Sequence, residues 1–247
     1  MTSEGVIVQV NNFTPVCIEF QQNIREYFGW NLQDDEEVLE WLQQNLVKFD
    51  DRWNDESQSN NLNELIMEIK SSEKFVVIGA NVTEDEIMTL STTTPLIVAD
   101  GAIGALLELN EDLLENVICL VSDGDGLPYI TNKKIGDMKI LLHTHGHAKI
   151  NLKHVLGIWN KWSKIPKIII SHQTFKSKKP AVNFGGFSDG DRAVCMLHSC
   201  GITKNNIRLI GFNTKNIGKW TGLSNTEIKR QKLEWMEKIL EDLGHVI

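Results

Sequence analysis

Residues 117–126 read VICLVSDGDG, and this stretch decides the fold class of the chain. Residues 117–121 are apolar, too few for a helix and rich in β-branched side chains, which predicts a buried strand. Glycines allow the chain to turn sharply where that strand ends. The turn carries Asp123 and Asp125, and such a pair of carboxylates suits a hard cation such as Mg²⁺. A plain Asp-Gly turn without a ligand is the alternative interpretation.

The same rhythm of short apolar runs and helical segments continues on both sides of this strand. Alternating strands and helices predict an α/β fold, a Rossmann-like and mostly parallel sheet with helices on both faces. The strands are expected at residues 75–78, 95–99, 117–121, 139–143, 167–170 and 207–211.

The first 70 residues have a different pattern, with apolar side chains at helical spacing. Residues 50–61, DDRWNDESQSNN, are polar and predict a loop or linker. We therefore expect a helical N-terminal region over residues 1–70 and an α/β catalytic domain over residues 71–247. The last helix is expected to begin at a capping box of Ser224 and Glu227 and to end near Gly244.

Composition places the chain among ordinary globular proteins, with 247 residues, 41% hydrophobic and 23% charged. The net charge of -8 argues against general nucleic-acid binding. The four cysteines form no CxxC pair, which favours reduced thiols. The start of the chain lacks a signal-peptide pattern, and no apolar run approaches the roughly 20 residues of a membrane span. We expect a cytoplasmic protein with no membrane partner.

Polar residues follow four of the predicted strands. In a parallel sheet, strand ends of this kind share one edge, where ligands bind. Asp100 can either cap the helix that follows it or contact a polar ring or a metal-bound water. The four segments are Gly79-Ala80-Asn81, Asp100-Gly101-Ala102, Asp123-Gly124-Asp125 and His143-Thr144-His145.

Three histidines, at positions 143, 145 and 147, would face one side of a continuing strand and invite a zinc hypothesis. Gly146 interrupts such a strand, and no cysteine lies nearby in the sequence. We expect these histidines to contact a metal or a phosphate, and we expect no structural zinc.

A second dense cluster, NFGGFSDGDR, covers residues 183–192. Ser188 and Asp191 form a capping-box pattern, which predicts a helix over residues 189–200. A glycine-rich loop that leads into a helix N-terminus is a ready anion site. Asp189 and Asp191 repel phosphate unless a cation lies between, so a cation-bridged phosphate or a polar heterocycle fits both features. Capping alone leaves the double glycine and Arg192 unexplained.

Taken in order, these motifs resemble the archaeal 6-hydroxymethyl-7,8-dihydropterin pyrophosphokinase family, whose core is similar to thiamin pyrophosphokinase. The resemblance includes the N-terminal helices around Phe28 and Asp35 and so covers most of the chain. The chain departs from the family pattern at Gly124, where a bulkier residue is usual, and at His147-Ala148, where Asp-Asn is usual. The matching motifs are ADGA at 99–102, VSDGDG at 121–126, HTHG at 143–146 and NFGGFSDGDRA at 183–193.

The resemblance implies ATP- and Mg²⁺-dependent transfer of a diphosphate to the hydroxymethyl group of 6-hydroxymethyl-7,8-dihydropterin, with release of AMP, in folate- or methanopterin-type biosynthesis. It implies that Asp100, Asp123 and Asp125 hold Mg²⁺ and that His145 donates to phosphate or accepts a proton. ATP, a reduced pterin and a second copy of the chain are the expected partners. The implied substrate-binding residues are Gly79, Asn81, Asp100, Gly101, His143, Gly185, Gly186, Ser188, Asp189, Asp191 and Arg192.

The residues leave other functions open. A diphosphokinase for thiamin or another small alcohol would need a different acceptor pocket. A metal-dependent phosphohydrolase would use the histidines as metal ligands and water as the nucleophile. A non-catalytic nucleotide-binding relative would keep the fold alone. Metal content and AMP release distinguish these alternatives.

Overall fold

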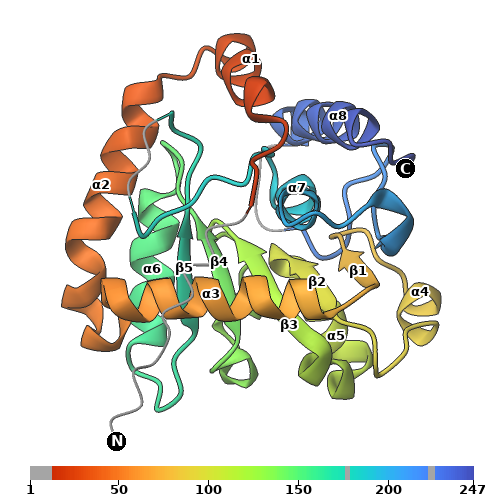
Figure 1. Ribbon diagram of the computed structural model, residues 1–247, viewed down its shortest axis with the longest axis horizontal. Helices are drawn as coiled ribbons and strands as arrows, with labels where there is room; N and C mark the ends of the chain where they lie inside the picture. Colours follow the sequence, from red (N-terminus) through yellow and green to blue (C-terminus); the bar gives the residue numbers. More distant parts are fainter. Residues whose placement is uncertain (1–12, 176–178, 222–225) are drawn as a thin grey trace, which may run out of the picture.

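A computed structural model describes residues 13–175, 179–221 and 226–247. Within these residues six strands form one sheet, in the order β5-β4-β3-β2-β1-β6, and every neighbouring pair is parallel. The predicted α/β fold with a parallel sheet is confirmed (Figure 1). The strands are β1 (Phe75–Ile78), β2 (Leu96–Ala99), β3 (Val117–Ser122), β4 (Lys139–His143), β5 (Lys167–Ser171) and β6 (Ile207–Ile210).

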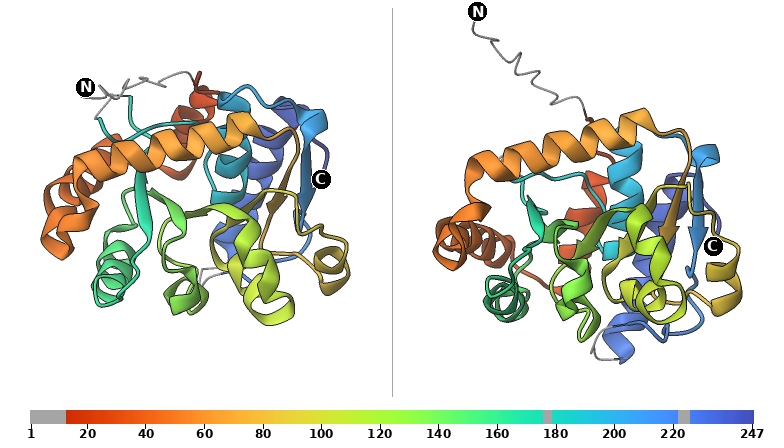
Figure 2. Two further views of the ribbon diagram at one scale, coloured as in Figure 1. Left: turned by 60° about the horizontal axis from the view of Figure 1, so that its bottom comes forward. Right: turned by 90° about the horizontal axis from the view of Figure 1, so that it is seen from below.

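Helices cover both faces of this sheet, and Figure 2 shows the sheet between the two layers. Successive strand residues point to opposite faces, so Val76 joins one hydrophobic cluster and Val77 joins the other. The first cluster contains residues of α2 (Leu32–Phe49), α4 (Glu84–Met88), α5 (Ile103–Leu109) and α6 (Lys149–Trp159). The second contains residues of α3 (Asp55–Ser71), α7 (Asp189–Ser199) and α8 (Thr226–Asp242).

The prediction of a loop or linker at residues 50–61 is wrong. A short 3-10 turn, Asp51–Trp53, leads directly into α3, which begins at Asp55. The side chain of Asn54 accepts a hydrogen bond from the backbone N–H of Ser57 at 2.9 Å and so caps this helix. Trp53 is buried, and its indole N–H donates to the carbonyl oxygen of Pro166 at 2.8 Å. The polar residues are therefore the exposed first turns of a longer helix.

The N-terminal helices share their cores with the sheet. Leu65 and Ile66 of α3 are fully buried in the second cluster, and Leu42 of α2 is fully buried in the first. The helix α1 (Ile18–Phe28) lies beside α8 (Figure 1), where Ile24 belongs to a smaller third cluster. The division of the chain at residue 70 stays a prediction.

The ends of the last two long helices fit their predicted signals. A capping box of Ser188 and Asp191 precedes α7, as the sequence indicated. The final helix ends two residues before Gly244, which has the left-handed φ of 81° expected of a helix stop. Ser224, the other half of the second predicted capping box, lies outside the described residues. Within the described residues, no helix combines the length and apolarity needed to cross a membrane.

Candidate active site

One pocket lies at the carboxyl edge of the sheet, where the predicted strand ends converge. The space between its walls is about 1050 Å³, a figure that includes the open solvent at its mouth. Of the residues predicted from the sequence, Gly79, Asn81, Asp100, Gly101, Asp123, Asp125, His143, His145, Ser188 and Asp189 line it.

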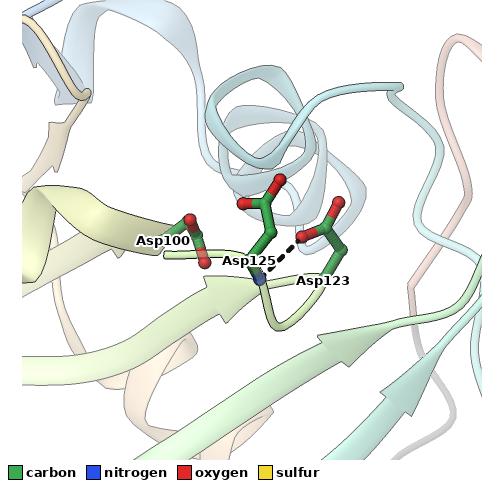
Figure 3. A group of neighbouring side chains, drawn as sticks. All are labelled: Asp100, Asp123 and Asp125. Carbon is green, nitrogen blue, oxygen red and sulfur yellow. Dashed lines mark hydrogen bonds between the residues drawn. The ribbon is translucent and has the colours of Figure 1, made fainter. Parts of the chain in front are cut away.

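Three aspartates form an acidic cluster in the middle of this pocket. Asp100 follows β2, whereas Asp123 and Asp125 follow the neighbouring β3. Each offers a carboxylate oxygen, and these oxygens lie within 4.8 Å of one another. The backbone N–H of Asp125 donates to Oδ1 of Asp123 at 3.2 Å, which fixes the turn between them (Figure 3).

The backbone conformation of Asp100 is unusual, and neighbouring residues hold its side chain in place. Its φ of 45° is left-handed, a backbone state that costs energy for a residue with a side chain. The hydroxyl of Ser122 donates to Oδ1 of Asp100 at 2.5 Å and accepts from the N–H of Gly124 at 2.9 Å. A Cβ atom at Gly126 would lie 2.4 Å from the Asp100 carboxylate, so only glycine fits behind it. These contacts hold a buried carboxylate toward the pocket.

The acidic cluster carries more negative charge than the protein alone neutralises. Burial, followed by the charges of Asp189 and Asp123, raises the pKa of Asp100 to about 7. Burial and the charge of Asp123 raise the pKa of Asp125 to about 9. Burial also raises the pKa of Asp189 well above its usual value, with the charge of Asp123 as the next cause. An all-oxygen donor set with this surplus charge fits a hard divalent cation such as Mg²⁺.

Asp123 is the member of the cluster that stays ionised. Burial acts to raise its pKa, but the hydrogen bond with His145 is the next cause and acts the other way, and the pKa of Asp123 is lowered. The Nε2 atom of His145 lies 3.0 Å from Oδ2 of Asp123. Its Nδ1 atom accepts a hydrogen bond from the N–H of His147 at 3.3 Å. Because Nδ1 accepts this hydrogen bond, Nε2 carries the proton that is donated to Asp123.

His143 is buried at the wall of the pocket, with 2% of its surface exposed. Its Nδ1 atom lies 3.3 Å from the hydroxyl of Ser171 at the end of β5. Its Nε2 atom has no hydrogen-bond partner among the described residues. Burial, followed by the charge of Arg192, lowers the pKa of His143 well below its usual value. A neutral imidazole with one unused nitrogen thus faces the pocket.

Comparisons with known proteins agree with the motifs. A curated 6-hydroxymethyl-7,8-dihydropterin pyrophosphokinase from Pyrococcus furiosus is 28% identical over 231 residues, which are 90% of this chain and 90% of that protein. A protein of the same name from Methanothermobacter thermautotrophicus is 28% identical over 92% of this chain and 93% of its own. One from Methanocaldococcus jannaschii is 27% identical over 64% and 66%.

The predicted resemblance to the archaeal pyrophosphokinases is confirmed. It rests on individual proteins, because no protein-family model matches the chain. The likeness covers 90% or more of the chain in two of these proteins, so it includes the N-terminal helices as well as the sheet.

Asp35, at the start of α2, holds the histidine loop in place, a role that no motif around this residue predicted. Its carboxylate accepts from the N–H of Gly146 at 2.8 Å and from the amide of Gln173 at 2.8 Å. The buried guanidinium of Arg25 lies 3.4 Å away and also donates to the carbonyl of Gln173 at 3.0 Å. The N-terminal helices thus fix the residue that directly follows His145.

The glycine-rich loop divides into a lining part and a supporting part. Ser188 and Asp189 line the pocket, whereas Gly185, Gly186, Asp191 and Arg192 are not among the described lining residues. Asp191 accepts from the N–H of Phe187 and, at 2.9 Å, from the N–H of Ser188. Arg192 is fully buried and donates to the carbonyls of Gly185 at 3.1 Å and Phe187 at 2.9 Å.

The sequence predicted that this glycine-rich loop contacts the substrate, but these hydrogen bonds lie within the loop itself. The donors of Arg192 are directed at backbone carbonyls that the loop itself supplies, so the guanidinium holds the loop rather than facing the pocket. Gly185 and Gly186 have φ values of 95° and 78°, and a Cβ at Gly185 would lie 1.7 Å from the carbonyl of Val16. Substrate contact by these four residues stays a prediction, while the structure gives each a supporting contact.

At the opposite end of the pocket, backbone segments approach closely. A Cβ at Gly79 would lie 2.6 Å from the carbonyl oxygen of Gly211, and the N–H of Asn81 donates to that oxygen at 3.1 Å. A Cβ at Gly101 would lie 2.1 Å from the carbonyl of Trp220. Here the glycines are required for the packing of the pocket wall. Asn213 and Asn216 join Asn81 in the lining.

Proposed function

We propose that this chain is a 6-hydroxymethyl-7,8-dihydropterin diphosphokinase, which uses ATP and Mg²⁺ and releases AMP. The observation that carries the proposal is the cluster of Asp100, Asp123 and Asp125 at the carboxyl edge of the sheet. Phosphoryl transfer depends mainly on positioning and on neutralising the charge of the phosphates. A candidate cation site in the lining of the pocket supports that chemistry.

In the proposal, the three aspartates hold Mg²⁺ through their oxygens, the ligand type this ion prefers. When bound, the ion neutralises phosphate charge and orients the transferred group. The proton that His145 donates from Nε2 keeps Asp123 ionised and oriented. The two roles predicted for His145, donation to phosphate and acceptance of the hydroxyl proton, both stay open in this proposal.

The remaining residues of the site bind and orient the substrates. Lys229 and Lys232 of α8 line the pocket and supply positive charge for phosphate oxygens. The hydroxymethyl oxygen bonds to the β-phosphorus of ATP while the bond from that phosphorus to the α–β bridging oxygen breaks. AMP leaves with the bridging oxygen, and the hydroxyl proton is released to solvent.

The test is an assay of AMP formation with Asp123→Asn and Asp125→Asn. Each variant keeps the side-chain shape and removes a charge, so we expect near-normal melting and a loss of turnover of roughly a hundredfold or more. Asp112→Asn is the matched control and should match the wild type, because Asp112 is exposed, lies in the 3-10 helix (Glu111–Asn116) that precedes β3 and is not among the described lining residues. Partial recovery at high Mg²⁺ would support direct ligation.

The acceptor is tested in the same assay by supplying the dihydropterin, thiamin or no acceptor. AMP and a pterin diphosphate formed only with the dihydropterin support the proposal. Thiamin diphosphate formation, or phosphate release without an acceptor, would favour the thiamin kinase or the hydrolase instead. Wild-type turnover in both Asn variants would show that the metal lies elsewhere.

A further inference from the structure

An aromatic wall, formed by Trp30 and Phe187, lies at one end of the pocket. Trp30, from the connection between α1 and α2, and Phe187, from the glycine-rich loop, both line the pocket, with ring centroids 6.0 Å apart. Phe28 stacks on Trp30 at 4.5 Å, with 14° between the ring planes, and braces it. The ammonium of Lys232 lies 5.8 Å from the centroids of both lining rings.

The order of the strands shows on which side of the acidic cluster the aromatic wall lies. The cluster follows β3 and β2, in the middle of the sheet, and the histidines follow the next strand, β4. The ring of His147 meets the Trp30 ring at 5.6 Å and 82°. Trp30 therefore belongs to the β4–β5 end of the pocket, whereas Gly79, Asn81 and Gly211 belong to the β1–β6 end.

A hydrogen-bonding group stands at the same end. His143 lines the pocket, and its buried Nε2 atom has no hydrogen-bond partner among the described residues. Gln173 also lines the pocket. Its side-chain amide donates a hydrogen bond to Asp35, and its side-chain oxygen accepts one from Arg192. A buried nitrogen without a partner costs free energy unless a ligand pairs with it. This end thus offers the flat faces of two aromatic rings and one unpaired polar atom, Nε2 of His143.

The geometry of transfer separates the two substrates. The attacking and leaving oxygens lie roughly in line on opposite sides of the transferred phosphorus, so the acceptor and the nucleoside occupy opposite ends of the pocket. Counted from the attacked β-phosphorus, the adenine of ATP lies beyond the α-phosphate and the ribose, and neighbouring strands are spaced by about 4.8 Å. The β1–β6 end extends two strands past Asp100 and carries Asn81, Asn213 and Asn216, amides suited to ribose hydroxyls.

We propose that Trp30, Phe187 and His143 form the acceptor subsite, in which a flat heteroaromatic ring stacks on the aromatic wall and pairs its polar edge with Nε2 of His143. The nucleoside of ATP then occupies the β1–β6 end. The choice of a reduced pterin as the ring rests on the proposed function. Trp30 is in this view the residue through which the N-terminal helices determine acceptor specificity.

The test measures binding of each substrate alone to the full-length chain. The probes are 6-hydroxymethyl-7,8-dihydropterin and an ATP analogue with a methylene group in place of the α–β bridging oxygen. Stacking of a base on an aromatic side chain is worth about 1–3 kcal/mol, so Trp30→Leu should weaken pterin binding by roughly 5- to 150-fold. Affinity for the analogue should stay within about twofold, because in this arrangement Trp30 does not contact the nucleotide.

Two further variants keep the test decisive if Trp30→Leu folds poorly. Trp30→Phe retains a flat ring, so it should keep most pterin affinity while bound pterin quenches less of the tryptophan fluorescence, the remainder coming from other tryptophans such as Trp220 in the pocket lining. Trp235→Phe is the matched control, because Trp235 packs against Phe20 and Tyr27 outside the described pocket lining. It should retain both the affinity and the quenching.

The outcomes separate this subsite from the proposed function. Weaker binding of the analogue with unchanged pterin binding would place the nucleoside at Trp30 and overturn the subsite. Turnover of pterin with an unchanged dissociation constant in Trp30→Leu would overturn the subsite and leave the function intact. Pterin that binds at Trp30 and is never converted would overturn the function and support the subsite. Failure of the wild type to bind pterin would overturn both.

Discussion

Replacing Asp35 with alanine tests whether the N-terminal helices hold the catalytic edge of the sheet. The carboxylate is 5% exposed and accepts from Gly146, Gln173 and Arg25. Asp35→Ala leaves the Arg25 guanidinium buried without its counter-charge and leaves the N–H of Gly146 without an acceptor. Both changes act on the folded state, and the second acts directly beside His145.

The size of the loss follows from these contacts. Removing one partner of a buried ion pair costs about 3–5 kcal/mol, because an uncompensated charge remains. The Arg25–Asp35 separation of 3.4 Å is long for a hydrogen bond, so we expect the lower half of that range from the pair. The unpaired N–H of Gly146 adds about 1–3 kcal/mol. Together the two effects predict a total loss of about 4–7 kcal/mol in unfolding free energy.

Urea unfolding followed by circular dichroism measures this loss, and AMP formation measures the effect on the site. At a temperature where the variant is folded, displacement of the loop after His145 should lower turnover by about tenfold or more. Asp34→Ala is the matched control, since Asp34 is the exposed neighbour in the same helical turn. A loss below about 1 kcal/mol together with turnover like that of the control would refute the reasoning.

Three further predictions concern charge and packing. The folded pKa values of Asp100 and Asp125, about 7 and about 9, exceed their ordinary 3.8, so the metal-free folded state binds more protons than the unfolded state. Its stability should fall as pH rises from about 4 to about 9, and Mg²⁺ should reduce the fall in thermal melts. Gly101→Ala places a Cβ 2.1 Å from a backbone carbonyl and should lower the melting temperature, whereas Gly157→Ala, with no atom within 4 Å of its Cβ, should not. Asp191→Ala uncaps α7 and should cost about 2 kcal/mol or more in urea unfolding.

The central sheet was predictable because its signals are local. Each strand is a short apolar run that ends in a polar or glycine-containing turn, and parallel pairing then brings all such turns to one edge. That geometry alone brings Asp100 within reach of Asp123 and Asp125, although 23 residues separate the first two in the chain. The sequence pattern therefore located the acidic cluster without any knowledge of side-chain contacts.

The supporting contacts were not predictable in the same way. Asp35 and Gly146 are separated by 111 residues, and their hydrogen bond leaves no periodic or compositional mark in the chain. Arg192 follows a glycine-rich loop, a pattern shared by anion sites, yet its partners are carbonyls of that loop. The helical start at residues 55–61 was missed because its buried contacts depend on Trp53 reaching Pro166 in a distant segment.

The order of the chain separates the N-terminal helices from the sheet, but the site does not. Asp35 fixes the loop that carries His145, and Trp30 lines the same pocket as the acidic cluster. Trp30 approaches His147, at one of the two positions where this chain departs from the pattern of the family it resembles. If the proposed acceptor subsite holds, acceptor choice can therefore change through the contact between an N-terminal residue and the histidine loop, while the three aspartates of the acidic cluster stay the same.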